Sequence, residues 1–420
     1  MSLIFQLFLS FAIMIAANRC LAHNHDNRLI RLLVVFVGLW TFGYGILAPI
    51  AVNVSGLVLV LPNFEYMGLA SIMLSISYTI FLFVYNQWSV KAALIKEKRP
   101  ARFSSILCLS IIFFAGTAAV PSQSGAKIYF ATIMLIPSIC LLYIYARRKS
   151  QLMISVALHL ITAYFCLQDE FFLSSKERII LITIFPPLFL MMVRYRITLN
   201  FRWVSAGLLV IAVFLASSVI VSSTRTGNEV TIGDGGSGFI AERLIASAGR
   251  LGVVDTAGAL IKNELTNDPI RPTMPIWSLV GTLFSVVPAT FERPNHPREM
   301  LPLAGYITSH DEVNLAGTTA GHLLWSYGWI GLLPSLLIFW CLFFSFVHVI
   351  ITLPKPFSEL ALISTLVLCL RLETTANVFL GSVFASVLVY LALSLLTLLV
   401  RACSLRVRDK GNSAPHFKRI

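Results

Sequence analysis

Residues 314–333 read NLAGTTAGHLLWSYGWIGLL, a polar, glycine-spaced run that passes directly into an apolar segment. The surrounding chain is 57% hydrophobic and 12% charged, whereas soluble domains keep about a quarter of their residues charged. A water-soluble fold is therefore excluded. The quoted stretch marks the point where a long polar segment ends and the chain enters the membrane.

Eleven apolar runs approach the roughly 20 residues needed for one membrane crossing. Lipid offers no partners to backbone polar groups, so runs rich in Leu, Ile and Phe without alternation predict helices. The expected fold is an all-α polytopic membrane protein. Its predicted spans are 2–18, 32–52, 67–86, 104–120, 128–146, 152–168, 178–193, 203–222, 324–347, 358–370 and 379–400.

The first span is predicted to be a retained helix. A secretory signal carries positive charge before its apolar run. Here residues 1–5 carry no charged side chain, and Arg19, Arg28 and Arg31 follow the run.

The distribution of charge predicts the orientation of the spans. The odd-numbered connections and the C-terminus together carry 21 of the 32 basic residues and only four acids. The positive-inside rule then places the N-terminus outside and the C-terminus in the cytoplasm. The net charge of +13 is thus explained by membrane topology, without a nucleic-acid partner. The basic tail, 401–420, is expected to contact the headgroups of membrane lipids.

Several motifs of other protein classes are missing from the sequence. No C-x-x-C pair supports a zinc site, and no P-loop or Rossmann fingerprint supports a nucleotide site. We therefore expect no metal and no cofactor. ATP-driven transport by this chain alone is disfavoured.

One connection, 223–320, is far longer than the others, and such loops are usually functional. Residues 1–222 and 321–400 form the expected membrane parts on either side of it. Within the loop, Ser237 is a plausible N-cap for a helix over 239–254. Arg243 and Arg250 share a face of that helix, and two guanidinium forks two turns apart suit a diphosphate. The alternative is a solvated face, or pairing with Glu242 or Asp255.

The rest of the loop is predicted to form an apolar interfacial segment followed by an extended segment with a fixed shape. Residues 275–288 are too few to span the membrane and too apolar for water, and the prolines of 288–302 fix extended backbone. His310, Asp311 and Glu312 can supply a general base, or they form a hydrated turn. The loop holds six arginines and one lysine, a bias that favours phosphate recognition, so further candidate cations are Arg225, Arg293 and Arg298, with Arg371 beyond the loop.

The quoted stretch carries candidates of its own. His322 and Trp325 lie one turn apart, and Tyr327 is an interfacial aromatic. The glycines, Gly328 among them, lower the side-chain bulk so that helices or a lipid chain can come close. The alternative is simple helix packing with an aromatic anchor. Inside the membrane, His159 is at least equally well explained as a packing residue.

In layout and in two motifs the chain resembles bacterial O-antigen polymerases of the Wzy type, which are related to the O-antigen ligases. The motifs are GTTAGHLLWSYGWIGLL at 317–333, with its G-x-x-G, and the proline-rich VPATFERPNHPR at 287–298. The chain lacks the acidic residue that many ligase-like relatives carry beside the G-x-x-G, which favours a polymerase.

The resemblance implies a C-type-glycosyltransferase-like fold and a metal-independent enzyme that needs no nucleotide sugar. It also implies a bacterial inner membrane, with the N-terminus and the long connection in the periplasm. Its substrate would be an undecaprenyl-diphosphate-linked oligosaccharide, with a chain-length regulator and a flippase as pathway partners. Arginines, first Arg243 and Arg250, would stabilise the leaving diphosphate, and His310, or else His322, Asp311 or Glu312, would assist the acceptor hydroxyl. Trp325, Tyr327 and Gly328 would line the lipid groove. The alternatives are ligation to lipid A–core and, in another class, a flippase or transporter of the same lipid-linked sugars.

Overall fold

The structure, a computed structural model, describes residues 2–21, 27–50, 64–92, 101–121, 127, 130–173, 175–195, 253–271, 318–370, 372 and 376–412, with single residues between 205 and 217. Every regular element within these ranges is a helix. Among the described residues, six helices are long and apolar enough to cross a membrane, as expected for an all-α membrane protein: Leu3–Leu21, Arg28–Ile50, Tyr66–Ser89, Lys149–Leu167, Thr319–Thr352 and Ala376–Val400.

Most of the other predicted spans correspond to shorter helices. These are α5 (Phe103–Ala119), η2 (Phe130–Leu135) with α7 (Ile136–Tyr145), α11 (Phe185–Arg194) and α18 (Phe357–Cys369). The predicted span 203–222 falls almost wholly outside the described residues. The total of eleven spans therefore stays a prediction.

Proline divides the helical segment predicted at 178–193. It consists of α10 (Lys176–Thr183) and α11, which meet at Ile184, and Pro186 is the second residue of α11. Proline has no N–H, so Pro186 cannot bond the carbonyl of Ile182 four residues earlier. The Nε2–H of His159, on α8 (Lys149–Leu167), donates to that carbonyl oxygen at 2.7 Å. The other ring nitrogen, Nδ1, lies 2.9 Å from the hydroxyl of Tyr143. Both nitrogens of this buried histidine are satisfied, which supports its reading as a packing residue.

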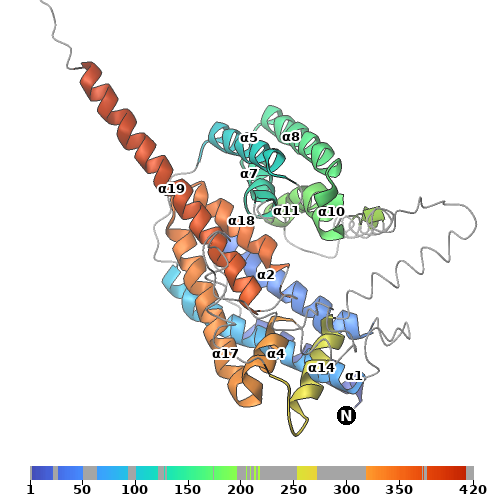
Figure 1. The fold of residues 1–420 in the computed structure, drawn as a ribbon. Helices are drawn as coiled ribbons and strands as arrows, with labels where there is room; N and C mark the ends of the chain where they lie inside the picture. Colours follow the sequence, from blue (N-terminus) through green and yellow to red (C-terminus); the bar gives the residue numbers. More distant parts are fainter. Residues whose placement is uncertain are drawn as a thin grey trace, which may run out of the picture.

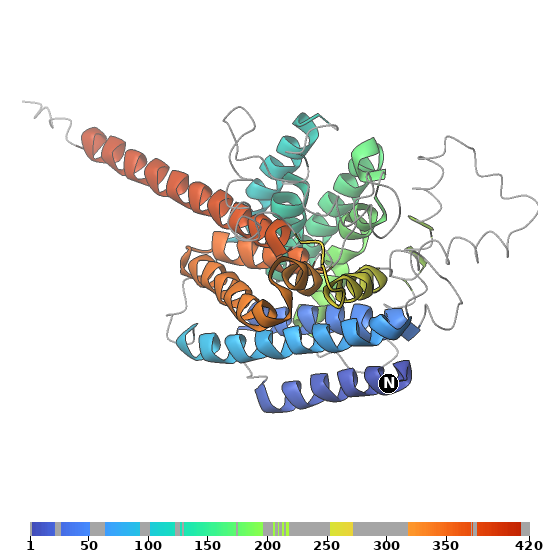
Figure 2. The ribbon, with the colours of Figure 1, turned by 60° about the horizontal axis from the view of Figure 1, so that its bottom comes forward.

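Two groups of helices make up the bundle (Figure 1). In one group, α4 (Phe64–Ala92) packs against α1 (Leu3–Leu21), α14 (Val253–Glu264) and α17 (Thr319–Thr352). Figure 2 shows α1 lying alongside α4, where the hydroxyl of Ser10 donates to the carbonyl of Ser71. The second group contains α5, α7, α8, α10 and α11. It meets the first through α18, which contacts both α7 and α2 (Arg28–Phe42), and through α11, which also contacts α2.

Some described elements depart from the simple helix pattern. The π-helix η1 (Gly43–Leu47) continues α2, the π-helix η2 precedes α7, and the short α9 (Glu170–Leu173) follows α8. The last helix, α19 (Ala376–Asn412), continues well past residue 400, where the predicted span ended, and extends away from the bundle (Figure 1). Part of the predicted basic tail is therefore helical.

The long helix α17 is two helices joined at Gly328. The backbone of Gly328 has φ 67° and ψ −177°, which no helix contains. A short helix, 319–327, precedes the break, and residues 329–352 follow it. At about 1.5 Å per residue the second part is about 36 Å long, enough to cross the hydrocarbon core of a bilayer.

Candidate functional site

Four of the residues predicted from the sequence lie in the described structure, and all are on α17. They are His322, Trp325, Tyr327 and Gly328. The other predicted site residues lie outside the described residues, so their roles stay predictions: His310, Asp311, Glu312, Arg225, Arg243, Arg250, Arg293, Arg298 and Arg371.

The two threonines of the quoted stretch begin the short helix. Thr318 has φ 64°, and its hydroxyl oxygen accepts a hydrogen bond from the N–H of Gly321 at 3.0 Å. The N–H and the hydroxyl of Thr319 both donate to the carbonyl of Leu372, at 3.1 and 2.9 Å. The start of α17 is thereby tied to the segment that precedes α19. A non-glycine residue with positive φ carries strain of a kind that collects at functional sites.

Small residues let α14 pack between α17 and α4. A methyl group added at Gly321 would come within 3.0 Å of Leu260 on α14. On the other side of α14, one added at Gly258 would lie 3.4 Å from the backbone of α4. Helix packing, the simpler alternative, thus accounts for Gly321.

Three hydrogen bonds to Ile270 fix the turn after α14, two from Asn263 of α14 and one from the short helix. The side chain of Asn263 bonds both the N–H and the carbonyl of Ile270, at 3.1 and 3.0 Å. The indole N–H of Trp325 donates to the same carbonyl at 2.6 Å. The side chain of Trp325 is fully buried, so it anchors this turn and does not face an open groove.

Arg271, the next residue, lies directly over the break in α17. Its Nη2 donates to Oε2 of Glu264, the last residue of α14, at 2.7 Å. A Cβ atom added at Gly328 would lie 2.5 Å from Nη2 and 2.6 Å from Nη1 of Arg271. Only glycine suits this position, because it permits both the positive φ and the close approach of the guanidinium.

The two members of this ion pair differ in exposure. The Glu264 side chain is 1% exposed, whereas that of Arg271 is 42% exposed. Burial raises the pKa of the Glu264 carboxyl above its ordinary value, although the charge of Arg271 acts in the opposite direction. Oε1 of Glu264 has no hydrogen-bond partner among the described residues. Arginine has five N–H donors, so the pair holds the guanidinium in place and leaves donors for an anion at its open side.

His322 lies on the short helix, six residues before the break at Gly328, and is not at the surface. Its side chain is fully buried, and its ring centre is 6.2 Å from that of Trp325. A substrate hydroxyl could reach the imidazole only if the neighbouring side chains moved. Tyr327 is half-buried.

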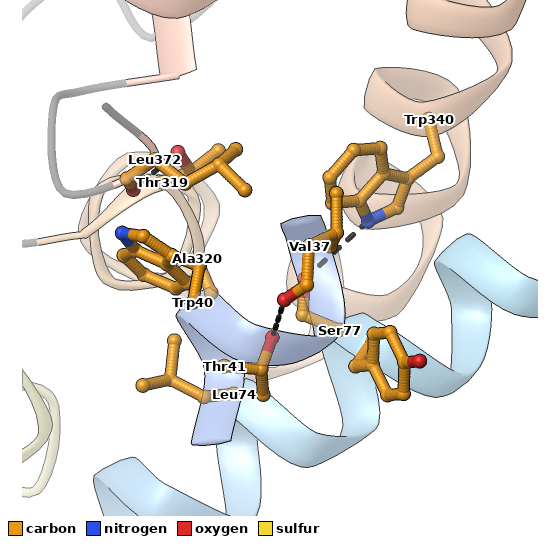
Figure 3. A pocket seen from close by; sticks show the side chains of 10 residues that line it. Val37, Trp40, Thr41, Leu74, Ser77, Thr319, Ala320, Trp340 and Leu372 are labelled. Atoms are coloured by element: carbon orange, nitrogen blue, oxygen red, sulfur yellow. Dashed lines mark hydrogen bonds between the residues drawn. The ribbon is translucent and has the colours of Figure 1, made fainter. Parts of the chain in front are cut away.

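A small cavity lies below the start of α17, between α2 and α4 (Figure 3). Thr41, Ser77 and Thr319 are among its polar lining residues, and the indole N–H of Trp340 donates to the hydroxyl of Ser77 at 3.4 Å. It has room for about one water molecule. A sugar would not fit, so this cavity is not a substrate site.

The sequence prediction missed Arg271, Glu264 and Asn263. Arg271 is one of six arginines in the long connection, and no local feature distinguishes it from the others. The one available signal is the repeated spacing of seven residues, Asn263 to Ile270 and Glu264 to Arg271, in a segment that ends in prolines. This spacing gains meaning only once the turn after α14 is known.

Comparison with known proteins gives no relative. No family model matches the chain, and no curated protein or solved structure is significantly similar to it. Any functional conclusion must therefore come from the residues of this chain.

Proposed function

We propose that this chain is a glycosyltransferase of the bacterial inner membrane that polymerises undecaprenyl-diphosphate-linked oligosaccharide repeat units at the periplasmic face. In this reaction the growing glycan leaves its diphosphate and joins a hydroxyl of the next lipid-linked unit. The layout of apolar helices around one long connection, and the O-antigen-polymerase-like motifs at 287–298 and 317–333, support this class.

One observation carries the proposal: the Arg271 guanidinium, held by Glu264 over the break at Gly328 and still 42% exposed. A departing diphosphate develops negative charge, and a pre-positioned cationic donor at that point lowers the barrier. A guanidinium binds phosphate oxygens bidentately, which suits it to this task. Arg271 thus joins Arg243 and Arg250 as a proposed diphosphate ligand. His310 remains the first choice for the base that assists the acceptor hydroxyl.

The experiment that tests this function is an electrophoretic profile of surface polysaccharide from a strain that lacks the gene. A polymerase predicts loss of the ladder, with survival of core that carries a single repeat unit. Loss of the single-unit core as well would contradict polymerisation and indicate a ligase or a flippase. Lipid-linked units would then accumulate on the periplasmic face for a failed ligase and on the cytoplasmic face for a failed flippase.

A further inference from the structure

The small cavity below the start of α17 lies halfway along two of the helices that enclose it. Ser77 lines it eleven residues after Tyr66 and twelve before Ser89, the two ends of one membrane span. Trp340 lines it from the middle of the second part of α17, residues 329–352. In a membrane the cavity therefore lies near the middle of the bilayer, where lipid offers no hydrogen-bond partners.

Helix ends meet at the same depth. Helix α17 begins beside the cavity at Thr319, and α18 ends at Cys369, shortly before Leu372, which also lines the cavity. Helix α19 begins at this level as well, since the ring centres of Phe379, in its first turn, and Phe339 of α17 are 5.8 Å apart. Backbone that is not helical is tolerated at this depth only where protein buries it or where it lines a hydrated cavity.

One donor at the cavity has no hydrogen-bond partner among the described residues. It is the indole N–H of Trp40 on α2, a residue that is only 8% exposed and that lines the cavity (Figure 3). Buried donors are nearly always bonded to protein or to ordered water, because an unsatisfied donor has lost its bonds to solvent without replacement. An acceptor inside the cavity would satisfy this N–H group.

Two hydroxyl oxygens on the cavity wall can accept hydrogen bonds. The hydroxyl of Thr41 donates to the carbonyl of Val37 at 2.8 Å, so its proton is used while its oxygen can still accept. The oxygen of Ser77 accepts from the indole of Trp340 at 3.4 Å and has a second lone pair. The cavity therefore combines one N–H donor with acceptors on α2 and α4.

We propose that this cavity binds one ordered water molecule, which accepts a hydrogen bond from Trp40 and donates to the oxygens of Thr41 and Ser77. The cavity has room for about one water molecule, and a buried water needs two to four polar partners. An anion would meet the lone pairs of two oxygens, and a metal cation would meet an N–H proton, so neither ion suits this wall. The water joins α2 to α4 beside the start of α17, independently of the proposed glycosyl transfer.

The first test detects the water directly. Solid-state NMR on the full-length chain in lipid bilayers, with isotope-labelled indole nitrogens, measures magnetisation transfer from water protons to each indole N–H, and Trp40→Phe identifies the Trp40 signal. The internal control is Trp325, which is fully buried and donates to the carbonyl of Ile270 at 2.6 Å. We expect transfer to Trp40 and little to Trp325. Transfer to Trp40 that is no greater than transfer to Trp325 would overturn the proposal.

The second test compares Thr41→Val with Thr365→Val. Both threonines are buried, and each hydroxyl donates to the carbonyl four residues earlier, at 2.8 and 2.9 Å. Thr365 does not line the cavity, so only Thr41→Val also removes an acceptor of the water. We expect Thr41→Val to lower the midpoint of thermal unfolding more than Thr365→Val and to weaken the transfer from water to Trp40. Equal midpoints with unchanged transfer would contradict the proposal.

A change of salt distinguishes water from an ion. The difference in unfolding midpoint between the wild type and Thr41→Val is measured in sodium chloride, potassium chloride, choline chloride and sodium gluconate at equal ionic strength. For a bound water we expect the same difference in all four salts. A difference that depends on the cation or on the anion would show that an ion occupies the cavity and would overturn the proposal.

Discussion

At the scale of single residues, the site depends on Gly328, Glu264 and Thr318. Gly328 admits the guanidinium and the left-handed backbone, Glu264 gives Arg271 a buried partner, and Thr318 begins the short helix despite its positive φ. Each of these features costs free energy on its own, through strain or through burial of a charge. Together they fix the position of one half-exposed cation.

Gly328→Ala should destabilise the protein and displace Arg271. The backbone conformation of Gly328 is nearly restricted to glycine, which costs about 1–3 kcal/mol for alanine, and the new Cβ would also collide with Nη2. The measurement is the midpoint of thermal unfolding in detergent. Gly43→Ala is the control, because Gly43 has helical φ and ψ, and a methyl group added there would meet no atom within 4 Å. Equal effects of the two substitutions would refute this account of Gly328.

Glu264→Gln should change how stability depends on pH. Burial raises the pKa of Glu264 in the folded protein, so ionisation of this carboxyl opposes folding. The contribution of the wild-type Glu264 carboxyl to the free energy of unfolding falls as the pH rises from the ordinary glutamate pKa to the raised pKa. Above the raised pKa this contribution is constant. The melting temperature of Glu264→Gln relative to wild type should therefore rise as the pH increases above the ordinary glutamate pKa and then level off above the raised pKa. If the difference in melting temperature between the variant and the wild type stays constant or falls as the pH rises, the pKa of Glu264 is not raised.

At the scale of elements, proline and glycine interrupt helices that hydropathy alone predicts as continuous. The apolar runs are sufficient to predict where most helices lie, because lipid leaves the backbone few alternatives. The division of 178–193 into α10 and α11 could have been suspected from Pro186. The break at Gly328 could not, because it depends on Arg271 approaching from another part of the chain.

His159→Ala should leave the carbonyl of Ile182 without a donor and lower the free energy of unfolding by about 1–3 kcal/mol. Loss of the contact with Tyr143 acts in the same direction. Thermal unfolding of the purified variant measures the effect. His348→Ala, at an exposed position on α17, provides the matched control and should be nearly neutral. A neutral result for His159→Ala would show that the freed carbonyl needs no partner.

At the scale of the whole molecule, the helical class and the membrane setting could be predicted, whereas the site could not. Composition and long apolar runs report the class directly. The site joins the end of α14, the turn after it and the break in α17, so it arises from packing between segments more than 50 residues apart, as the Trp325–Ile270 bond shows. The predicted arginines of the loop, Arg243 and Arg250 first, still await a test.

Reporter fusions test the predicted orientation. Alkaline phosphatase fused after residue 271 should be active, since it folds only outside the cytoplasm, and green fluorescent protein fused at the C-terminus should fluoresce. We expect this result because the odd-numbered connections and the tail together carry 21 of the 32 basic residues, which places them in the cytoplasm. The reverse pattern would place the Arg271 site in the cytoplasm and exclude a periplasmic polymerase.

The central claim is that the Arg271 guanidinium stabilises the diphosphate that leaves during polymerisation. The most direct measurement is the polysaccharide ladder of a deletion strain complemented with wild type, Arg271→Ala, Arg271→Lys or, as a control, Lys262→Ala, at equal amounts of membrane protein. Loss of such a donor commonly lowers turnover about 100-fold. We predict that Arg271→Ala abolishes the ladder, that Arg271→Lys restores little because lysine lacks the fork, and that Lys262→Ala is normal. A full-length ladder from Arg271→Ala would contradict the account.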